Sequence, residues 1–358
     1  MANLGTNYGE KFAKGSMKRF KQRAVAPMIT NDKYEGEIKG GGADRVNILT
    51  YGIPEITDYT GADFTFDTVE EVEGTMIIDQ KKLWKFQILD WDKFKSYAND
   101  VNSVEIQNAG DQLERVVDAY VLSFYADAGR RVGTDYSTGT VTVTVTTGAV
   151  VGSGTTFTAA MVGAKFIIDG EVYRVKTFTD ATHIVIEDDK DDETSAYTGG
   201  AKAGGSSYEI EGYAKKQVTK DTIDGYVLEA KEQLDSAFVP ATERFLVVSS
   251  KIHSILLQSG QLTPYTPSAF EDVVKLGIVG MYRGFKVISN EQVSGNNSDG
   301  YHCLAGHPSA ITFAFAMVKS EIAKLENNFG KGYKGLSCYG AKVLDVRRTA
   351  LVDMWLYV

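Results

Sequence analysis

The chain has 358 residues, enough for about two domains. Its 38 basic and 47 acidic side chains give a net charge of −9, which argues against a globally basic nucleic-acid binder but leaves room for a local basic patch. Hydrophobic residues make up 43% of the chain, which excludes wholesale disorder. The sequence has no apolar run of 18 residues and no apolar segment near its N-terminus, so we expect neither a membrane span nor a signal peptide.

The composition also disfavours most catalytic chemistry. The chain has two cysteines and four histidines, and none of the common zinc, nucleotide-binding or hydrolase motifs occurs. The one local cluster is His302, Cys303 and His307, whose spacing fits no standard zinc pattern. We therefore expect no enzyme, no metal and no cofactor, and two buried, reduced thiols at Cys303 and Cys338.

The N-terminal part of the chain predicts an arm followed by a ribbon. Residues 1–43 have little apolar periodicity and end in three glycines, and six basic residues and one acid lie between Glu10 and Arg23. Residues 44–92 alternate like two long strands around an acidic tip, with eight acids and one arginine in 44–73. An isolated two-stranded ribbon is marginally stable, so we expect other structure to cover it.

The middle of the chain predicts a long helix and then a β module. Residues 108–128 carry a helical apolar stripe, comprising Leu113, Val116, Val117, Tyr120, Val121 and Phe124. Residues 137–211 hold short β-branched runs, with fourteen threonines, ten glycines and no proline between 137 and 210. Because α+β sequence lies on both sides, this segment is interpreted as a small all-β insertion whose ends lie close together.

The remaining chain predicts alternating helices and strands. A helix at 221–238 carries an apolar stripe that includes Phe238, and Pro240 stops it. Strands are predicted at 245–248, 284–289 and 301–306, and a helix capped by Ser249 or Ser250 at 250–259. The segment 308–319 is interpreted as a helix with Pro308 in its first turn, and the apolar end of the chain as a sheet strand.

This order of elements resembles the major capsid proteins of tailed bacteriophages, which have the Hong Kong 97-type shell fold. The resemblance covers most of 1–136 and 212–358. Each motif is a diffuse pattern, so the order of the motifs along the chain is stronger evidence than any single motif. The segments that carry it are IIDQKKLWKFQILDWDKF (77–94), LDSAFVPATERFLVVSSKIHSILL (234–257) and GIVGMYRGFKVISNEQV (277–293), with weaker support from HPSAITFA (307–314) and GLSCYGAKVLDVRRTALV (335–352). The β module at 137–211 is a departure, of a kind familiar in this family.

The resemblance implies an α+β shell fold with peripheral and axial domains. Its implied parts are an N-terminal arm (1–43), an extended β-ribbon loop (44–92), a peripheral domain with a spine helix (93–136), the inserted surface domain (137–211), an axial domain (212–318) and a return to the peripheral domain (319–358). The implied function is self-assembly into an icosahedral head shell around double-stranded DNA. The implied partners are further copies of the chain in pentamers and hexamers, a scaffolding protein, portal and decoration proteins, and DNA bound without sequence specificity. The implied location is the virion, after assembly in the host cytoplasm.

The opposite charges of the arm and the ribbon predict a contact between them. The resemblance implies that this contact joins neighbouring subunits, while the hinge at Gly40–Gly42 also permits pairing within one chain. The predicted contact residues are Lys18, Arg19, Lys21 and Arg23 on the arm, and Asp67, Glu70, Glu71 and Glu73 on the ribbon. One variant of the family cross-links a loop lysine to a neighbouring asparagine. No lysine lies between Lys39 and Lys81 here, so we expect a non-covalent shell.

Three other functions remain open at this stage. An encapsulin-like nanocompartment shell would share the fold. A tail or surface β protein would bind glycans through 137–211, using Phe157, Phe166, Tyr173, Phe178, Tyr197 and Tyr208 as platforms, although such spacings are more typical of a core. An enzyme would rest on the His302, Cys303 and His307 cluster alone.

Overall fold

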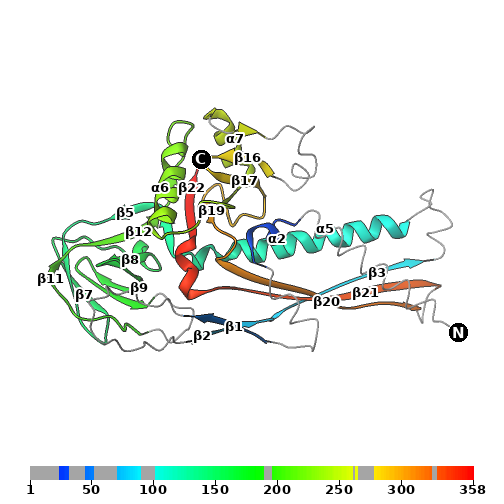
Figure 1. The fold of residues 1–358 in the computed structure, drawn as a ribbon, viewed down its shortest axis with the longest axis horizontal. Helices are drawn as coiled ribbons and strands as arrows, with labels where there is room; N and C mark the ends of the chain where they lie inside the picture. The colour runs from blue at the N-terminus through cyan, green and yellow to red at the C-terminus, as the bar shows by residue number, and fades with distance from the viewer. Residues whose placement is uncertain are drawn as a thin grey trace, which may run out of the picture. The chain divides into compact units, whose positions relative to one another are not determined.

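The computed structural model describes residues 24–31, 45–51, 71–89, 101–188, 196–260, 263–264, 278–324 and 329–358. Figure 1 shows these residues coloured in chain order. The chain divides into two compact units. The first comprises Met1–Met17, Asn31–Gln107 and Thr312–Leu344. The second comprises Lys18–Thr30, Asn108–Ile311 and Asp345–Val358.

The first unit contains a ribbon and a three-stranded sheet. Strand β1 (Arg45–Tyr51) pairs antiparallel with β2 (Glu71–Ile77) along the full length of both. The sheet has the order β20-β21-β3, formed by β20 (Ile311–Lys324), β21 (Gly330–Val343) and β3 (Gln80–Leu89). A small core joins the two, comprising Ile48, Met76, Ile78, Ala314, Cys338 and Leu344. The ribbon is therefore anchored at the end where its strands meet this core.

The described part of the segment 74–92, which ends at Leu89, belongs to two strands where the sequence pattern indicates one. The chain leaves the ribbon at Ile77 and enters the other sheet at Gln80. Met76 and Ile78 are buried on the same alternation that continues through Trp84 and beyond. Because the alternation of buried and exposed residues continues without a break, the sequence pattern does not reveal where the chain passes from the ribbon into the other sheet.

The predicted helix at 308–319 is wrong, because this segment is the 14-residue strand β20. Its residues from Ile311 to Phe315 are all buried, so both faces of the strand are covered. Such a continuous apolar run has no period of two and resembles a buried helix. In the strand, the ring of Phe315 stacks on Tyr339 of the neighbouring β21, with centroids 6.3 Å apart.

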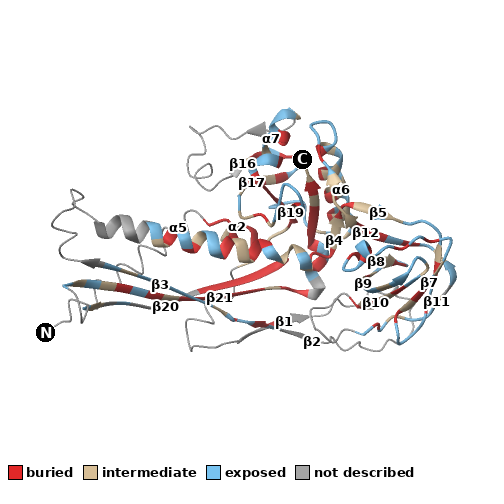
Figure 2. Cartoon of the chain, turned by 180° about the vertical axis from the view of Figure 1, so that it is seen from behind, coloured by how far each residue is buried: buried red, intermediate tan, exposed pale blue. Residues whose placement is uncertain are grey.

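Helix α5 (Val101–Leu122) confirms the predicted long helix but starts earlier, and a 3₁₀ turn, η1 (Ser123–Asp127), follows it. Leu113, Val117 and Val121 are buried as predicted. Val116 is 42% exposed. Figure 2 shows the resulting change from buried to exposed around the helix.

The second unit is built on a nine-stranded sheet. Its order is β13-β22-β19-β14-β17-β16-β15, with β18 beside β19 and β4 beside β22. The strands are β4 (Arg130–Val132), β13 (Lys216–Gln217), β14 (Phe245–Val248), β15 (Thr263–Pro264), β16 (Ile278–Tyr282), β17 (Phe285–Ser289), β18 (Gly295–Asn296), β19 (Gly300–Gly306) and β22 (Leu351–Tyr357). The predicted strands at 245–248, 284–289 and 301–306 are confirmed. So is the strand at the end of the sequence, β22, which follows η3 (Asp345–Ala350) and is buried along most of its length (Figure 2).

Two helices accompany this sheet, α6 (Ile223–Ser236) and α7 (Ser250–Gln258). The predicted stripe of α6 is confirmed at Ile223, Val227, Ala230 and Leu234, all buried. It is wrong at Phe238, which lies beyond the helix and is 95% exposed. The predicted N-cap position of α7 is confirmed at Ser249, but its side chain does not make the capping hydrogen bond. Glu291 Oε1 instead accepts from the backbone N–H of Ser250 at 2.8 Å.

The β-rich middle of the chain forms an eight-stranded sheet with its own core. The order is β11-β6-β7-β10-β9-β8-β12-β5. A short 3₁₀ turn, η2 (Ala159–Met161), accompanies the strands β5 (Thr134–Tyr136), β6 (Thr140–Val143), β7 (Ala149–Ser153), β8 (Lys165–Ile168), β9 (Glu171–Asp180), β10 (His183–Asp188), β11 (Lys202–Ser206) and β12 (Tyr208–Ala214). The buried residues of this core, among those that the structure describes, lie between Val141 and Ile210, and Tyr136 and Tyr213 pack against them.

Candidate functional site

Most of the predicted arm and ribbon contact residues lie outside the described residues. This applies to Lys18, Arg19, Lys21, Arg23, Asp67 and Glu70. Glu71 and Glu73 belong to β2, where they pair with Tyr51 and Leu49. These positions lie at the end of the ribbon away from the Arg45–Ile77 pair, next to the segment 52–70. The proposed contact between arm and ribbon thus stays a prediction.

The inner end of the arm is held by one buried carboxylate. Asp118 of α5 is 1% exposed, and it accepts from Val25 N–H at 3.1 Å and from Ala26 N–H at 2.9 Å. These donors open the short helix α2 (Ala26–Ile29), whose first N–H groups have no partner within the helix. Asn290 Nδ2 donates to the same carboxylate at 2.9 Å. Three segments far apart in sequence therefore converge on Asp118.

Burial has the largest effect on the pKa of the Asp118 carboxyl group. Desolvation raises the pKa of Asp118 from 3.8 to about 6, while the hydrogen bonds from Ala26, Val25 and Asn290 act in the opposite direction. Sequence reasoning missed Asp118 because a lone acid in an amphipathic helix is normally solvated. The sequence does carry a signal that Asp118 is buried. Leu122 lies one helical turn after Asp118 on the same side of α5, and it is a buried apolar residue outside the predicted stripe.

The three-stranded sheet of the first unit carries exposed lysines on both of its faces, because Lys85 and Lys334 alternate along the strands with Lys82 and Lys331. Its strands hold one acid, Glu321, against six exposed lysines, which are Lys81, Lys82, Lys85, Lys324, Lys331 and Lys334. Lys85 lies directly opposite Lys334 in the register of β3 and β21, and Lys334 pairs with Glu321 at 3.3 Å. Like charges on facing residues destabilise a strand pair, and the Glu321 carboxylate offsets part of this repulsion.

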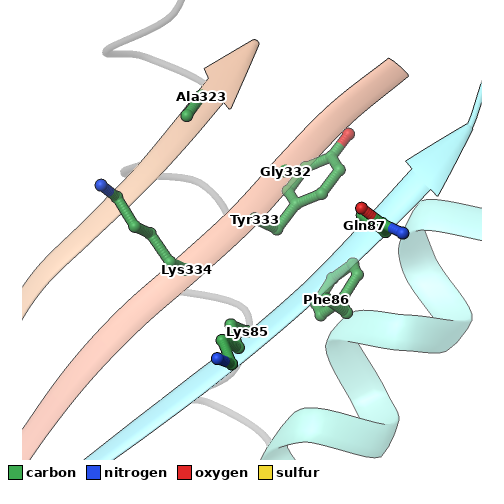
Figure 3. A pocket seen from close by; sticks show the side chains of 7 residues that line it. All are labelled: Lys85, Phe86, Gln87, Ala323, Gly332, Tyr333 and Lys334. Carbon is green, nitrogen blue, oxygen red and sulfur yellow. The ribbon is translucent and has the colours of Figure 1, made fainter. Parts of the chain in front are cut away.

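A hollow of about 450 Å³ opens on this sheet (Figure 3). Gly332 contributes no side chain opposite Gln87, and Lys85 and Lys334 are among the residues that line the space. Aromatic rings form a row beside it, with centroids 6.1 Å apart for Trp84 and Phe86 and 5.0 Å apart for Phe86 and Tyr333. The indole of Trp84 lies over Gly335, in the space that a Cβ at position 335 would occupy.

A buried ionic network lies in the nine-stranded sheet. Asp353 of β22 is fully buried, and its Oδ2 accepts from Arg131 Nε at 2.9 Å and faces His302 Nδ1 at 2.9 Å. The imidazole lies between two aromatic rings, with centroid distances of 3.9 Å to Tyr125 and 5.2 Å to Trp355. The network therefore ties β4, β19 and β22 to η1.

The predicted cluster around Cys303 does not come together as a site. Cys303 is fully buried, and burial raises the pKa of its thiol to about 12. His302 faces Asp353, and His307 Nδ1 lies 2.8 Å from Ser309 Oγ. Within the described ranges, no group of three or more His, Cys, Asp or Glu side chains is placed to hold a metal, and no helix is long and apolar enough to span a membrane. Both cysteines are free and buried, as predicted.

The aromatic residues of the β module do not form an exposed platform on which a glycan could stack. Five of the six proposed platform residues are at most 5% exposed and belong to the module core, namely Phe157, Phe166, Tyr173, Tyr197 and Tyr208. Phe178 packs against the same core and is partly buried. Side chains that fill a core cannot stack on a sugar, so this set gives no support to carbohydrate binding.

The two ends of the β module meet in a narrow neck. A Cβ on Gly133 would stand 2.6 Å from the Cα of Gly212, so the two backbones touch. Arg130 donates to Glu211 Oε1 at 2.6 Å, and Tyr136 pairs directly with Ile210. The close ends agree with an insertion, while independent folding of the module stays a prediction.

We expect the body of the protein to fold without the module. Replacing residues 137–209 by Asn-Gly joins the partners Tyr136 and Ile210 through a two-residue turn and keeps Glu211 with Arg130. The variant should unfold cooperatively, with a melting temperature within a few degrees of the full chain. The matched control also removes Ile210 and Glu211, and should be less stable because Arg130 loses its carboxylate. Loss of the cooperative transition in the first variant would show that the module is integral to the fold.

The comparisons with known proteins concern the fold. No protein-family model and no curated protein matches the chain. Among solved structures, a chain of Mycobacterium phage Che8 matches with a TM-score of 0.55 at 18% identity, over 93% of this chain and 91% of that one. The capsid of cyanophage P-SCSP1u matches with a TM-score of 0.52 at 14% identity, over 94% and 86%. The capsid of Ralstonia phage GP4 matches with a TM-score of 0.51 at 13% identity, over 92% and 86%. The predicted phage capsid shell fold is thus confirmed.

Proposed function

We propose that this protein is the major capsid protein of a tailed bacteriophage, which self-assembles into the icosahedral head shell that encloses double-stranded DNA. The observation that carries the proposal is the match over more than nine-tenths of the chain to solved phage capsid chains. Because a fold can serve several functions, local features supply the remaining support. They are the two-stranded ribbon, the arm anchored at Asp118 and the lysine-rich three-stranded sheet.

The proposed partners are further copies of the chain, other capsid components and DNA. Copies of the chain form the pentamers and hexamers of the shell. A separate scaffolding protein, a portal and decoration proteins complete the particle, and DNA fills it without sequence-specific contacts. The location is the virion, after assembly in the host cytoplasm, and the role is structural and not enzymatic.

Expression of the full chain followed by sedimentation tests this function. We expect particles of megadalton size in place of monomers. Particles recovered from infected cells should protect double-stranded DNA from nuclease, which separates a phage head from a nanocompartment that encloses proteins. Particles that contain only protein cargo would favour the encapsulin-like alternative.

The arm and ribbon contact gives a prediction on assembly. Reversing Lys18, Arg19 and Lys21 to Glu should raise the critical concentration for assembly roughly tenfold at low salt, since each exposed ion pair contributes only about 0–1 kcal/mol and salt screens it. Light scattering over a salt series measures the effect. Reversal of Glu70, Glu71 and Glu73 to Lys should restore assembly in part.

The matched control for this triple reversal keeps every charge, with Lys18→Arg, Arg19→Lys and Lys21→Arg. It should assemble like the original chain at each salt concentration. If the charge-reversed arm assembles as well as this control at low salt, the arm charges serve another purpose.

A further inference from the structure

Three segments of the second unit meet at the buried carboxyl group of Asp118. The backbone N–H groups of Val25 and Ala26 donate to it from the arm, and Asn290 Nδ2 donates to it from the loop after β17. The arm residues at this point are as buried as a core, since Ala24 and Ala26 are each 1% exposed. The carboxyl group is therefore a polar attachment point for the arm inside an apolar contact.

No basic side chain among the described residues forms an ion pair with Asp118. One turn earlier on α5 lie Glu114, which is half-buried, and Arg115, which is exposed. Helix α2 has no titratable side chain, and Glu291 in the loop after β17 accepts from Ser250 N–H instead. An ionised carboxylate that is buried without a counter-charge is costly, whereas the neutral acid is tolerated.

Hydrogen bonds offset only part of this cost. The three donors from Val25, Ala26 and Asn290 favour the ionised form, yet burial raises the pKa of Asp118 to about 6. The contact between the arm and α5 is therefore stronger when Asp118 carries a proton.

We propose that Asp118 is a proton-controlled latch, which holds residues 24–30 of the arm on α5 at acidic pH and lets them detach as the pH rises. Detachment hydrates the carboxylate, which then regains its ordinary pKa. The closed state has the higher pKa, so its extra stability is complete below about pH 4 and is lost as the pH rises through 6. The basic stretch at 18–23 directly precedes the latch, so the latch determines whether this stretch is tethered to α5. The inference goes beyond the shell function and does not depend on it.

Hydrogen exchange of the Val25 and Ala26 amides in the unassembled full chain measures the opening of the latch. After correction for intrinsic exchange, the opening constant should rise about tenfold between pH 5 and pH 7.5, as expected for pKa values of about 6 closed and 3.8 open. Leu304 in the interior strand β19 is the reference, because it is fully buried and exchanges through global unfolding. The two arm amides should exchange faster than this reference.

Three variants assign the effect to Asp118. In Asp118→Asn, the opening constant should change less than about twofold over the same pH range. The matched control Glu114→Gln removes a carboxylate one turn away on the same helix and should keep the tenfold rise. Asn290→Ala tests the direction of the effect. Because the Asn290 amide lowers the pKa of Asp118, its removal should move the midpoint of the rise to a higher pH.

Three results would overturn the latch. Arm amides that exchange at the rate of Leu304 would show that the arm opens only when the whole unit unfolds. An opening constant that is independent of pH in the original chain would show that no proton controls it. A tenfold rise that persists in Asp118→Asn would assign the proton to another group. Each of these results leaves the proposed shell function untouched, because the measurement uses the subunit before assembly.

Discussion

Replacing Asp353 by alanine will lower the free energy of unfolding by about 3–5 kcal/mol. Asp353 is fully buried and lies 2.9 Å from both Arg131 Nε and His302 Nδ1. Removing the carboxylate leaves the guanidinium of Arg131, whose side chain is 12% exposed, without its counter-charge. Urea unfolding followed by circular dichroism measures the loss.

The matched control uses a second histidine–aspartate pair at the same distance. His183 Nδ1 and Asp180 Oδ1 are 2.9 Å apart, but both side chains are about half exposed. Asp180→Ala should therefore change the unfolding midpoint far less than Asp353→Ala. Equal midpoints for the two variants would contradict the buried network. The double variant Arg131→Met with Asp353→Leu should recover part of the loss, because it removes both buried charges together.

The pH dependence of stability will change when Asp118 is replaced by asparagine. Burial raises the pKa of Asp118 to about 6, above its ordinary value of 3.8, so folding favours the neutral acid. Its contribution to stability is fully present below pH 4 and is lost as the pH rises through 6. Two pKa units correspond to about 3 kcal/mol.

Relative to Asp118→Asn, the original chain should therefore lose about 3 kcal/mol of unfolding free energy between pH 4 and pH 7.5. The difference isolates Asp118, because every other group titrates in both proteins. A carbon-detected NMR titration should place the carboxyl pKa of Asp118 near 6. Parallel stability curves across this pH range would contradict the assignment.

Much of the fold follows from sequence where one face of an element is buried. The stripes of α5 and α6 are examples, since Val117 and Val227 lie on a 3.6-residue period that only a helix satisfies. Strand β14 was predictable too, as a short apolar run with β-branched residues between turn signals. Strand β20 was not, because burial on both faces removes the period that distinguishes a strand from a helix.

The candidate surfaces depend on tertiary pairing, which no local pattern encodes. Asp118 resembles a solvated helix residue until α2 and Asn290 are brought against it. Phe238 fits the α6 stripe by spacing, yet the helix ends two residues earlier and the left-handed turn directs the ring outward. Lys85 and Lys334 face each other only because β3 pairs with β21. The sequence supplied the residue types, while their proximity required the fold.

Cryo-electron microscopy of the purified full-length chain tests the shell function most directly. The account predicts closed particles with icosahedral symmetry, in which each subunit contacts its ring neighbours through different surfaces of the same chain. A protein that stays monomeric at concentrations well above those at which phage shells form, with or without scaffolding protein, would contradict the central claim.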